Sequence, residues 1–349
     1  QIALYLLNFI HFCKIIKFHL NITEAKLKSI FKRSKGRKIA IIGDVMLDKY
    51  VYGTISRISP EAPVPVVDID KTEFRLGGAA NVANNIKALE AEPVLIGVIG
   101  NDYDSKHYLD VMRALGLSTV GIIKDNSRPT TAKTRVIAHS QHVLRVDSEI
   151  KDDINTSTGK KIIDYLNRNI RSFAAVILQD YNKGVLTSGM ISKIISIAKK
   201  YNKPVYVDPK FHNFFEYRDV TVFKPNRKET ADILAMKIDG EESVKEAGRK
   251  LIDKLNCEYL VLTRGEKGMM LFDKEKNKTV ILNIPTKARK VADVSGAGDT
   301  VISTIAVMLA GGANIIEAVM LANQAAGIVC EEVGIIPITK KALLDSYKN

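Results

Sequence analysis

Short apolar runs alternate with longer helical patterns along most of this chain, and this alternation restricts the class of fold. Residues 38–43 form a run that is apolar after Lys38 and is followed by an acid, which is typical of a buried strand in a parallel sheet. A repeated order of strand and helix predicts an α/β fold with a mostly parallel sheet. The pattern predicts further strands at 94–99, 119–123, 174–179, 204–207, 220–223, 259–263 and 268–272, and helices at 79–89, 103–115, 160–170, 188–200, 228–236 and 314–329.

The segment 291–300 places an acid at the end of a glycine-rich turn, just before the apolar stretch 301–310. The stretch has the length of a helix, so Gly296, Ala297 and Gly298 should form its first turn, where free backbone N–H groups attract anions. Asp299 is then placed to take a proton from a hydroxyl group, and the segment favours phosphoryl transfer. Alternatively, Asp293 or Ser295 only caps a buried helix and Asp299 complements its dipole.

Two segments in this order, Leu76–Ala83 and Val291–Thr300, resemble the signatures of the ribokinase-like, or PfkB, carbohydrate kinases. The segment 224–229 is similar to the Asn-x-x-Glu segment of these enzymes. The resemblance implies a ribokinase-like three-layer α/β/α fold, with a small β lid at about 50–76 inserted in a kinase domain at 25–349. It also implies ATP and Mg²⁺ as cofactors, with a monovalent cation such as K⁺ as a possible addition.

The resemblance also assigns roles around the nucleotide. Asp299 becomes the base, and the turn 296–298 holds the transferring phosphoryl group. Asn226 and Glu229 organise water around the metal, although the same spacing fits an N-cap with its capping-box glutamate. The remaining nucleotide contacts are expected from Arg227 and Lys228 and from a loop that could equally be a charged hairpin turn, at Thr263, Gly265 and Gly268.

A narrower resemblance links the segments 43–66, 134–147 and 180–186 to kinases that phosphorylate D-glycero-D-manno-heptose 7-phosphate at O1. It implies a place in ADP-heptose synthesis for the lipopolysaccharide core. In such kinases an adenylyltransferase domain often follows on the same chain. Because this sequence stops at Asn349, we expect a separate protein to add the nucleotide.

The sugar is expected to meet the strand ends and the lid. Asp44 follows the first strand, where ligands of open α/β sheets collect, although it could simply cap a turn. Gly77 and Gly78 are expected as the lid hinge, or only as a turn before the next helix. Arg145, which we list for the phosphate, could instead form a cross-strand ion pair with Asp147. The expected substrate contacts are Asp44, Asp48, Gly77, Gly78, Asn81 and Gln141, with Arg135, Arg145 and Lys183 for the phosphate and Asp208 for the pocket.

Composition fits an enzyme with a large core, because 46% of the 349 residues are hydrophobic and 26% are charged. The net charge of +13 is spread along the chain without a basic run interleaved with aromatics, so we expect no nucleic-acid partner. Three scattered cysteines indicate a reducing cytoplasm. The sequence has no Walker A string, no Ser-His-Asp order with a nucleophile elbow, and no metal-ligand spacing among His139, His142 and His212.

Residues 1–24 are apolar at the start but are soon interrupted by His11, Lys14 and Lys17, so the segment is too short to span a bilayer. We interpret it as an appended helix or leader outside the catalytic fold. The lid predicts a homodimer. Two competing functions remain, a kinase for another sugar such as fructose phosphate or ribose, and a non-catalytic protein that binds a sugar phosphate.

Overall fold

The computed structural model describes residues 22–139, 141–275, 278–286, 292–332 and 334–347. The appended segment predicted at residues 1–24 therefore lies outside the described residues up to Asn21, and so does Val291 of the glycine-rich segment. The first described helix, α2 (Glu24–Ser34), is capped by the side chain of Thr23, which accepts from the N–H of Lys26 at 3.2 Å. It packs against a helix near the other end of the chain.

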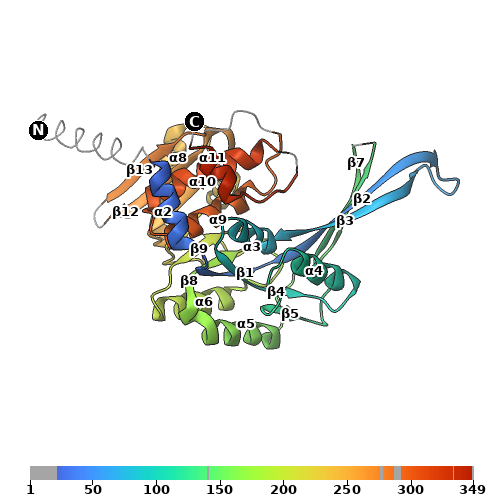
Figure 1. The fold of residues 1–349 in the computed structure, drawn as a ribbon, viewed down its shortest axis with the longest axis horizontal. Coiled ribbons are helices and arrows are strands. Elements are labelled where there is room, and N and C mark those ends of the chain that lie inside the picture. The colour runs from blue at the N-terminus through green and yellow to red at the C-terminus, as the bar shows by residue number, and fades with distance from the viewer. Residues whose placement is uncertain (1–21, 140, 276–277, 287–291, 333, 348–349) are drawn as a thin grey trace, which may run out of the picture.

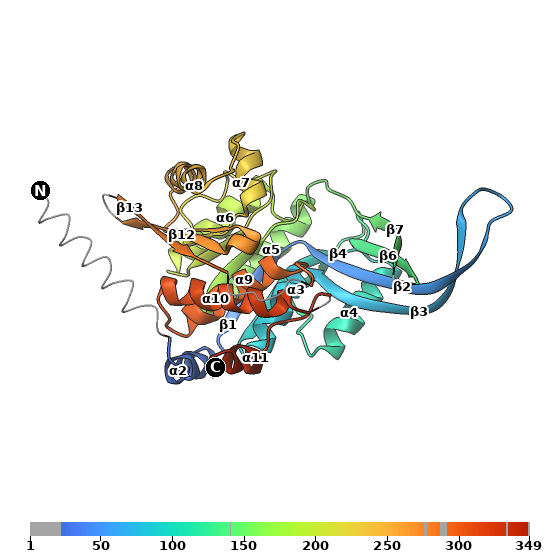
Figure 2. The same cartoon turned by 90° about the horizontal axis from the view of Figure 1, so that it is seen from above.

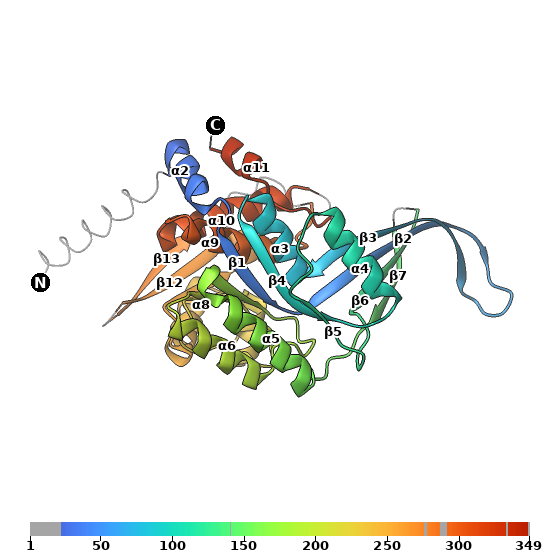
Figure 3. The ribbon, with the colours of Figure 1, turned by 60° about the horizontal axis from the view of Figure 1, so that its bottom comes forward.

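A large twisted sheet forms the middle layer (Figures 1 and 3). Its neighbours run parallel from β5 to β11, and β12 and β13 add an antiparallel edge. Antiparallel strands need only a tight hairpin, so this edge follows β11 without a crossover helix. Within the described ranges the order is β13 (Lys278–Ile284), β12 (Met269–Glu275), β11 (Tyr259–Thr263), β10 (Val222–Phe223), β9 (Val205–Asp208), β8 (Phe173–Gln179), β1 (Lys38–Gly43), β4 (Glu92–Ile99), β5 (Ile122–Lys124).

Helices cover both faces of this sheet. They are needed there because successive apolar residues of a central strand point to opposite faces, and both faces must be buried. Ile39 and Ile41 of β1 belong to one buried cluster, whereas Ala40 and Ile42 belong to another on the opposite face. The three-layer α/β/α fold is thus confirmed (Figures 1 and 2). One face carries α2, α3 (Ala79–Ala88), α4 (Tyr103–Ala114), α9 (Ala297–Ala310), α10 (Ile315–Cys330) and α11 (Lys340–Asp345), and the other carries α5 (Thr156–Asn169), α6 (Ser188–Lys200), α7 (Arg227–Leu234) and α8 (Glu241–Leu255).

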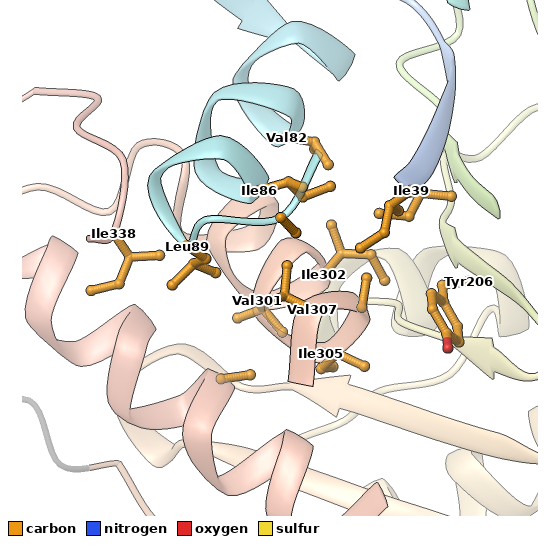
Figure 4. Packing of buried hydrophobic residues seen from close by; sticks show 14 of the residues in the cluster. Ile39, Val82, Ile86, Leu89, Tyr206, Val301, Ile302, Ile305, Val307 and Ile338 are labelled. Carbon is orange, nitrogen blue, oxygen red and sulfur yellow. The ribbon is translucent and has the colours of Figure 1, made fainter. Parts of the chain in front are cut away.

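Helix α9 lies at the centre of the first cluster, and its residues 299–308 are all buried. Figure 4 shows Ile302 of α9 close to Ile39 of the sheet and to Ile86 of α3, with Ile305 farther along the helix. A helix that is apolar on every side is a core helix, because each of its faces must meet another element. The packing of α9 therefore fixes the position of its first turn at the edge of the sheet.

A second, four-stranded sheet in the order β3, β2, β6, β7 projects from the main body as the lid (Figure 1). Its strands are β2 (Val45–Ile58), β3 (Pro65–Gly78), β6 (Ala132–Ala138) and β7 (Gln141–Ser148). The lid is larger than the expected segment 50–76, because β6 pairs with β2 in parallel and brings β7 with it. That pairing joins residues about eighty positions apart, which local sequence patterns do not register.

Most predicted helices and strands are present within a few residues of their expected ends. The strand expected at 119–123 is three residues long and starts at Ile122. Helix α8 was not among the predictions, because its sequence is mostly charged and only one stripe that includes Val244, Leu251 and Leu255 is buried. No helix in the described part of the chain has the length and apolar composition needed to cross a membrane.

Gly248 provides a test of how tightly α8 packs on the sheet. A methyl group added there would overlap the ring of Phe272 in β12, which is fully buried. We expect Gly248→Ala to lower the free energy of unfolding by about 1–3 kcal/mol, because overpacking exceeds the gain in helix propensity. Gly189→Ala in α6 is the matched control, since a methyl group there meets nothing within 4 Å and should be neutral or stabilising. Urea unfolding measures both, and equal effects would contradict the close packing.

Candidate active site

The first turn of α9 faces the carboxyl ends of the central parallel strands. Gly296 is the N-cap with φ of +77°, and no side chain caps the helix. Asp293 instead accepts from the N–H of Ser295 at 2.8 Å and from that of Gly334 at 3.1 Å. The alternative in which Asp293 or Ser295 caps the helix is therefore wrong. The N–H of Ala297 donates to the carbonyl of Val294 at 3.3 Å, whereas those of Gly298 and Asp299 have no backbone acceptor among the described residues. These two N–H groups are left for an anion, with the positive end of the helix dipole behind them.

Three elements converge on the carboxylate of Asp299, which is 4% exposed. Asn81 of α3 donates from Nδ2 to one oxygen at 2.7 Å. Gln179, at the end of β8, donates from Nε2 to the other oxygen at 3.0 Å, and the hydroxyl of Tyr181 donates to the same oxygen at 2.8 Å. These three donors hold the carboxylate in one orientation.

Burial raises the pKa of Asp299 to about 6, and the nearby charge of Asp208 raises it as well. The hydrogen bonds from Asn81 and Tyr181 and the charge of Lys224 act in the opposite direction. A carboxylate with this pKa is mostly ionised at neutral pH and is still basic enough to accept a proton. This balance suits a general base.

A buried ion pair lies beside Asp299. Lys224 is 3% exposed, and its ammonium is 2.9 Å from Asp208, which also accepts from Gln179 at 3.1 Å. The same ammonium would lie 3.4 Å from a Cβ at Gly298. A buried positive charge thus stands next to the first turn of α9. Lys224, Gln179 and Tyr181 were not individually expected, although each follows or ends a strand at this edge of the sheet.

Two neighbouring cavities meet over this turn. The first, of about 480 Å³, is bordered by charged side chains, among them Asp208, Lys210, Lys224, Glu229 and Asp299. The second, of about 350 Å³, is more apolar. Both are bordered by Thr263, Gly265, Val294 and Gly298, so they adjoin each other. Of the residues expected around the nucleotide, Asn226, Arg227, Lys228 and Gly296 also line the first cavity, and Gly268 and Ala297 also line the second. The second cavity is lined in addition by residues that we did not expect there, Met269, Asn323, Ala326 and Cys330.

Asn226 and Glu229 form the capping box of α7, which is the alternative that their spacing in the sequence left open. Asn226 accepts from the N–H of Glu229 at 2.8 Å, and Glu229 accepts from that of Asn226 at 2.9 Å. The other oxygen of Glu229 pairs with Lys210. Both residues border the charged cavity, and their oxygens suit the hydration shell of Mg²⁺. The described residues contain no group of three or more His, Cys, Asp or Glu that could hold a metal directly.

Asp44 has a partner set of its own. It is 1% exposed and accepts from the N–H groups of Tyr181 at 2.7 Å, Lys183 at 3.1 Å and Val185 at 3.2 Å. These bonds fold the loop after β8 so that Tyr181 reaches Asp299. Burial raises the pKa of Asp44 despite them. Its expected contact with sugar hydroxyls stays a prediction.

The other expected substrate residues are spread over the lid and its base. Asp48, 2% exposed, pairs with Arg135 and lies against Gly77. Gly78, with φ of +60°, is the N-cap of α3. Gln141 and Arg145 lie on the exposed strand β7.

The ion pair with Asp147, which was the alternative for Arg145, is present in the lid. Arg145 and Asp147 lie 3.0 Å apart on the same strand, and Asp147 lies across from Lys133. The alternative is therefore confirmed as an ion pair, although it runs along one strand and not across two. Lys183 pairs with Glu149 at 2.6 Å.

Residues 37–342 match the model of the pfkB family carbohydrate kinases. The chain belongs to this family. It is thus a sugar kinase, which transfers a phosphoryl group to an alcohol, and the family implies ATP and typically Mg²⁺. The chain is similar to the bifunctional protein HldE of Geobacter sulfurreducens, with 40% identity over 92% of the chain and 65% of that protein. HldE of Helicobacter pylori strain J99 is 39% identical over 85% of the chain and 64% of that protein. The chain therefore spans less than two thirds of these relatives.

Solved structures confirm the ribokinase-like fold. Phosphofructokinase-2 from Escherichia coli in complex with fructose-6-phosphate gives a TM-score of 0.73 at 17% identity, covering 90% of this chain and 98% of that one. Arabidopsis thaliana ribokinase complexed with ribose and ATP gives 0.69 at 20% identity, covering 90% and 99%.

Gly296 allows a test of the turn. At φ of +77° an alanine is strained, and its Cβ would lie 3.0 Å from Nδ2 of Asn81, which holds Asp299. We expect Gly296→Ala to cost about 1–2 kcal/mol of stability and to lower sugar kinase activity strongly. Gly36→Ala is the matched control, because φ is +67° there and a Cβ meets nothing within 4 Å. It should lose similar stability and keep its activity, as thermal melting and ADP release would show. Unchanged activity in Gly296→Ala would contradict this role for the turn.

Proposed function

We propose that this chain transfers the γ-phosphoryl group of ATP to the anomeric O1 of D-glycero-D-manno-heptose 7-phosphate. The product is the 1,7-bisphosphate, an intermediate on the route to ADP-heptose for the lipopolysaccharide core. The observation that carries the reaction class is the buried Asp299 carboxylate beside the uncapped first turn of α9. The substrate rests on the lid segments that resemble heptose kinases and on the similarity to HldE proteins.

Asp299 accepts the proton of O1 while that oxygen attacks the γ-phosphorus in line with the leaving ADP. Asn81, Gln179 and Tyr181 keep the carboxylate pointed at the hydroxyl. The N–H groups of Gly298 and Asp299, joined by that of Ala297 once it leaves the Val294 carbonyl, stabilise the charge on the transferring group, and the ammonium of Lys224 adds to them from one side.

The two cavities divide the nucleotide between them. The more apolar one, bordered by Thr263, Gly265 and Gly268, receives the base and ribose, and the charged one receives the phosphates. Arg227 and Lys228 stand at the rim of the charged cavity. Asn226 and Glu229 would hold the Mg²⁺ through water, and the metal would supply positive charge against the phosphates. Opening the Lys210 ion pair frees Glu229 for this task.

The sugar lies between the first turn of α9 and the lid. Asn81 donates to Asp299, and Gly77 and Asp48 lie against each other at the base of the lid. Gly78 lets the chain turn from the lid into α3. Asp208 borders the charged cavity. Asp44 holds the loop after β8 by accepting from the N–H of Tyr181. Gln141, Arg145 and Lys183 complete the proposed set from β7 and from the base of the lid.

We also propose that the chain is cytoplasmic and forms a homodimer through its lid. The strands β2, β3 and β7 of the lid and the loop between β2 and β3 expose apolar side chains, which a second lid would bury. Those that are more than half exposed are Ile58, Val64, Ile69, Leu144 and Val146.

The test of substrate and reaction is ADP release with Mg²⁺ and ATP across heptose 7-phosphate, fructose 6-phosphate, fructose 1-phosphate, fructose and ribose. We expect selective turnover of heptose 7-phosphate. Asp299→Asn should fold and lose turnover by roughly 10²–10⁴-fold, because it removes the base. The control Asp110→Asn lies on the surface of α4 and should match the wild type.

Each other outcome contradicts one part of the proposal. Preference for a different sugar would overturn the substrate. Near-wild-type rates in Asp299→Asn would overturn the base. Silence with every sugar, despite tight nucleotide binding, would favour a non-catalytic binding protein.

The pH dependence follows from the raised pKa of Asp299. The base is active when ionised, so kcat/KM should fall as the pH drops through about 6, the pKa that burial sets. The Tyr181 hydroxyl lowers this pKa, so Tyr181→Phe should move the acid limb of the profile to higher pH. Tyr165→Phe on α5 should leave the limb in place. An acid limb near pH 4, or no shift in Tyr181→Phe, would contradict the assignment.

A further inference from the structure

The edge of the main sheet opposite the candidate active site carries a dense positive charge. Parallel strands start at the same edge of a sheet, so the turns before β10, β9, β8 and β1, which are neighbours, lie in one row. We call the residues of these turns, 32–38, 168–172, 199–203 and 218–219, the basic edge. It contains one acid, Asp219, and eleven basic residues, Lys32, Arg33, Lys35, Arg37, Lys38, Arg168, Arg171, Lys199, Lys200, Lys203 and Arg218.

Contacts along this row show that the turns adjoin one another. Lys203 donates from Nζ to the carbonyl oxygen of Arg171 at 3.0 Å. The ring centroid of Tyr201 lies 5.5 Å from the guanidinium carbon of Arg171 and 5.8 Å from the ammonium of Lys200. Lys38 begins β1 beside the start of β8. The basic side chains of different turns therefore form one patch.

Few carboxylates neutralise the basic edge. Within the described ranges, two of its eleven basic residues form ion pairs, Lys38 with Glu92 at 3.5 Å and Lys199 with Asp219 at 2.9 Å. Ten of the eleven are exposed, and Lys203 is half-buried. Four adjacent strands span only about 15 Å, so these like charges repel one another, and an anionic partner would relieve the repulsion. The positive charge is spread along the sequence but gathered in the fold.

The basic edge is too far from the two cavities to serve the nucleotide or the sugar. Helix α9 has 14 residues, so about 21 Å separates its first turn at the active site from its other end. At that other end, Arg33 of α2 donates from Nε to the carbonyl oxygen of Gly311 at 2.6 Å. Figures 1 and 3 show α2 at the end of the molecule away from the lid. A partner on the basic edge therefore leaves both cavities open.

The sequence of residues 1–21 indicates which kind of anionic partner fits. These residues lead into α2, which ends within the basic edge at Ser34. They include four aromatic residues and eight Ile or Leu, together with Lys14 and Lys17, and none of them is an acid. Such a composition suits the boundary between lipid headgroups and acyl chains. Nucleic acid or an acidic protein would match the positive charge alone.

We propose that the basic edge binds the anionic surface of a membrane through lipid phosphates, with the apolar residues in 1–21 as a second contact. One weak signal gives marginal, reversible attachment, whereas an apolar contact and a basic patch together give stable attachment. Each Lys or Arg close to the surface adds affinity that salt screens. The kinase then works at the membrane surface with its cavities facing the solution. This inference does not depend on which sugar the kinase phosphorylates.

The test is co-sedimentation of the full chain with phosphatidylcholine vesicles that contain or lack phosphatidylglycerol. We expect binding to the anionic vesicles, and we expect it to weaken as salt is added. The edge variant carries Lys35→Gln, Arg37→Gln, Arg168→Gln and Lys200→Gln. It should lose roughly 10²- to 10³-fold in vesicle affinity, because four charges near the surface are removed.

The matched control variant removes four exposed charges outside the basic edge, with Lys106→Gln, Lys160→Gln, Lys161→Gln and Lys237→Gln. Its net charge equals that of the edge variant, and it should bind vesicles nearly as well as the wild type. Both variants should keep the wild-type melting temperature and the wild-type rate of ADP release in solution, since none of these residues lies in the proposed catalytic or binding set.

The second contact has a test of its own. Phe9→Ser combined with Phe12→Ser removes apolar surface and no charge, so it should weaken the vesicle binding that remains at high salt. Wild-type binding by this variant at high salt would overturn the apolar contact.

The other outcomes judge the basic edge. Equal vesicle binding by the edge variant and the control variant would overturn it as the binding surface. Equal binding to vesicles with and without phosphatidylglycerol would overturn the electrostatic contact. A chain that leaves anionic vesicles unbound but retains single-stranded RNA or polyglutamate in the same buffer would overturn the lipid partner in favour of nucleic acid or an acidic protein. Each of these failures leaves the proposed function standing, because kinase activity is measured separately.

Discussion

The structure depends on the burial of α9 in the middle of the molecule. Every side chain from 299 to 308 is buried, so the helix cannot slide or rotate without opening the core. This fixes an uncapped helix end and a carboxylate at the edge of the sheet. Three hydrogen-bond donors offset part of the free-energy cost of burying the charged carboxylate of Asp299. The part of the cost that is not offset raises the pKa of this group. The apolar packing of α9 therefore also fixes the position of the acid at its first turn.

The same edge explains why so many polar groups are buried side by side. Asp44, Asp180, Asp208 and Asp299 all follow or face parallel strands, and their mutual repulsion and burial are offset by backbone N–H groups, tyrosine hydroxyls and Lys224. Burial and the charge of Asp44 raise the pKa of Asp180 to about 6. The lid, by contrast, is a projecting sheet, and its strand β7 is exposed along its whole length.

Much of the fold and part of the site could be predicted from the sequence. The apolar runs of the central strands and the helix 301–310 have local periodicity, and Gly296 and Asp299 are adjacent in the chain, so their relation is local. Gln179, Tyr181 and Lys224 are different, because they reach Asp299 only after three strands align. The capping box of Asn226 and Glu229 shows the limit of a spacing argument, since one pattern fits both a helix cap and a metal shell.

The sequence by itself determined the α/β class, the glycine-rich turn and the acid that follows it, because strand, helix and turn preferences act between near neighbours. Tertiary structure decided which side chains hold that acid, where the two cavities meet, and that β6 and β7 join the lid. It also decided that Arg75 and Arg135 share the ring of Tyr50, although sixty positions separate them. Such contacts form only when distant strands pair in register, and register is set by the burial of whole faces of a sheet.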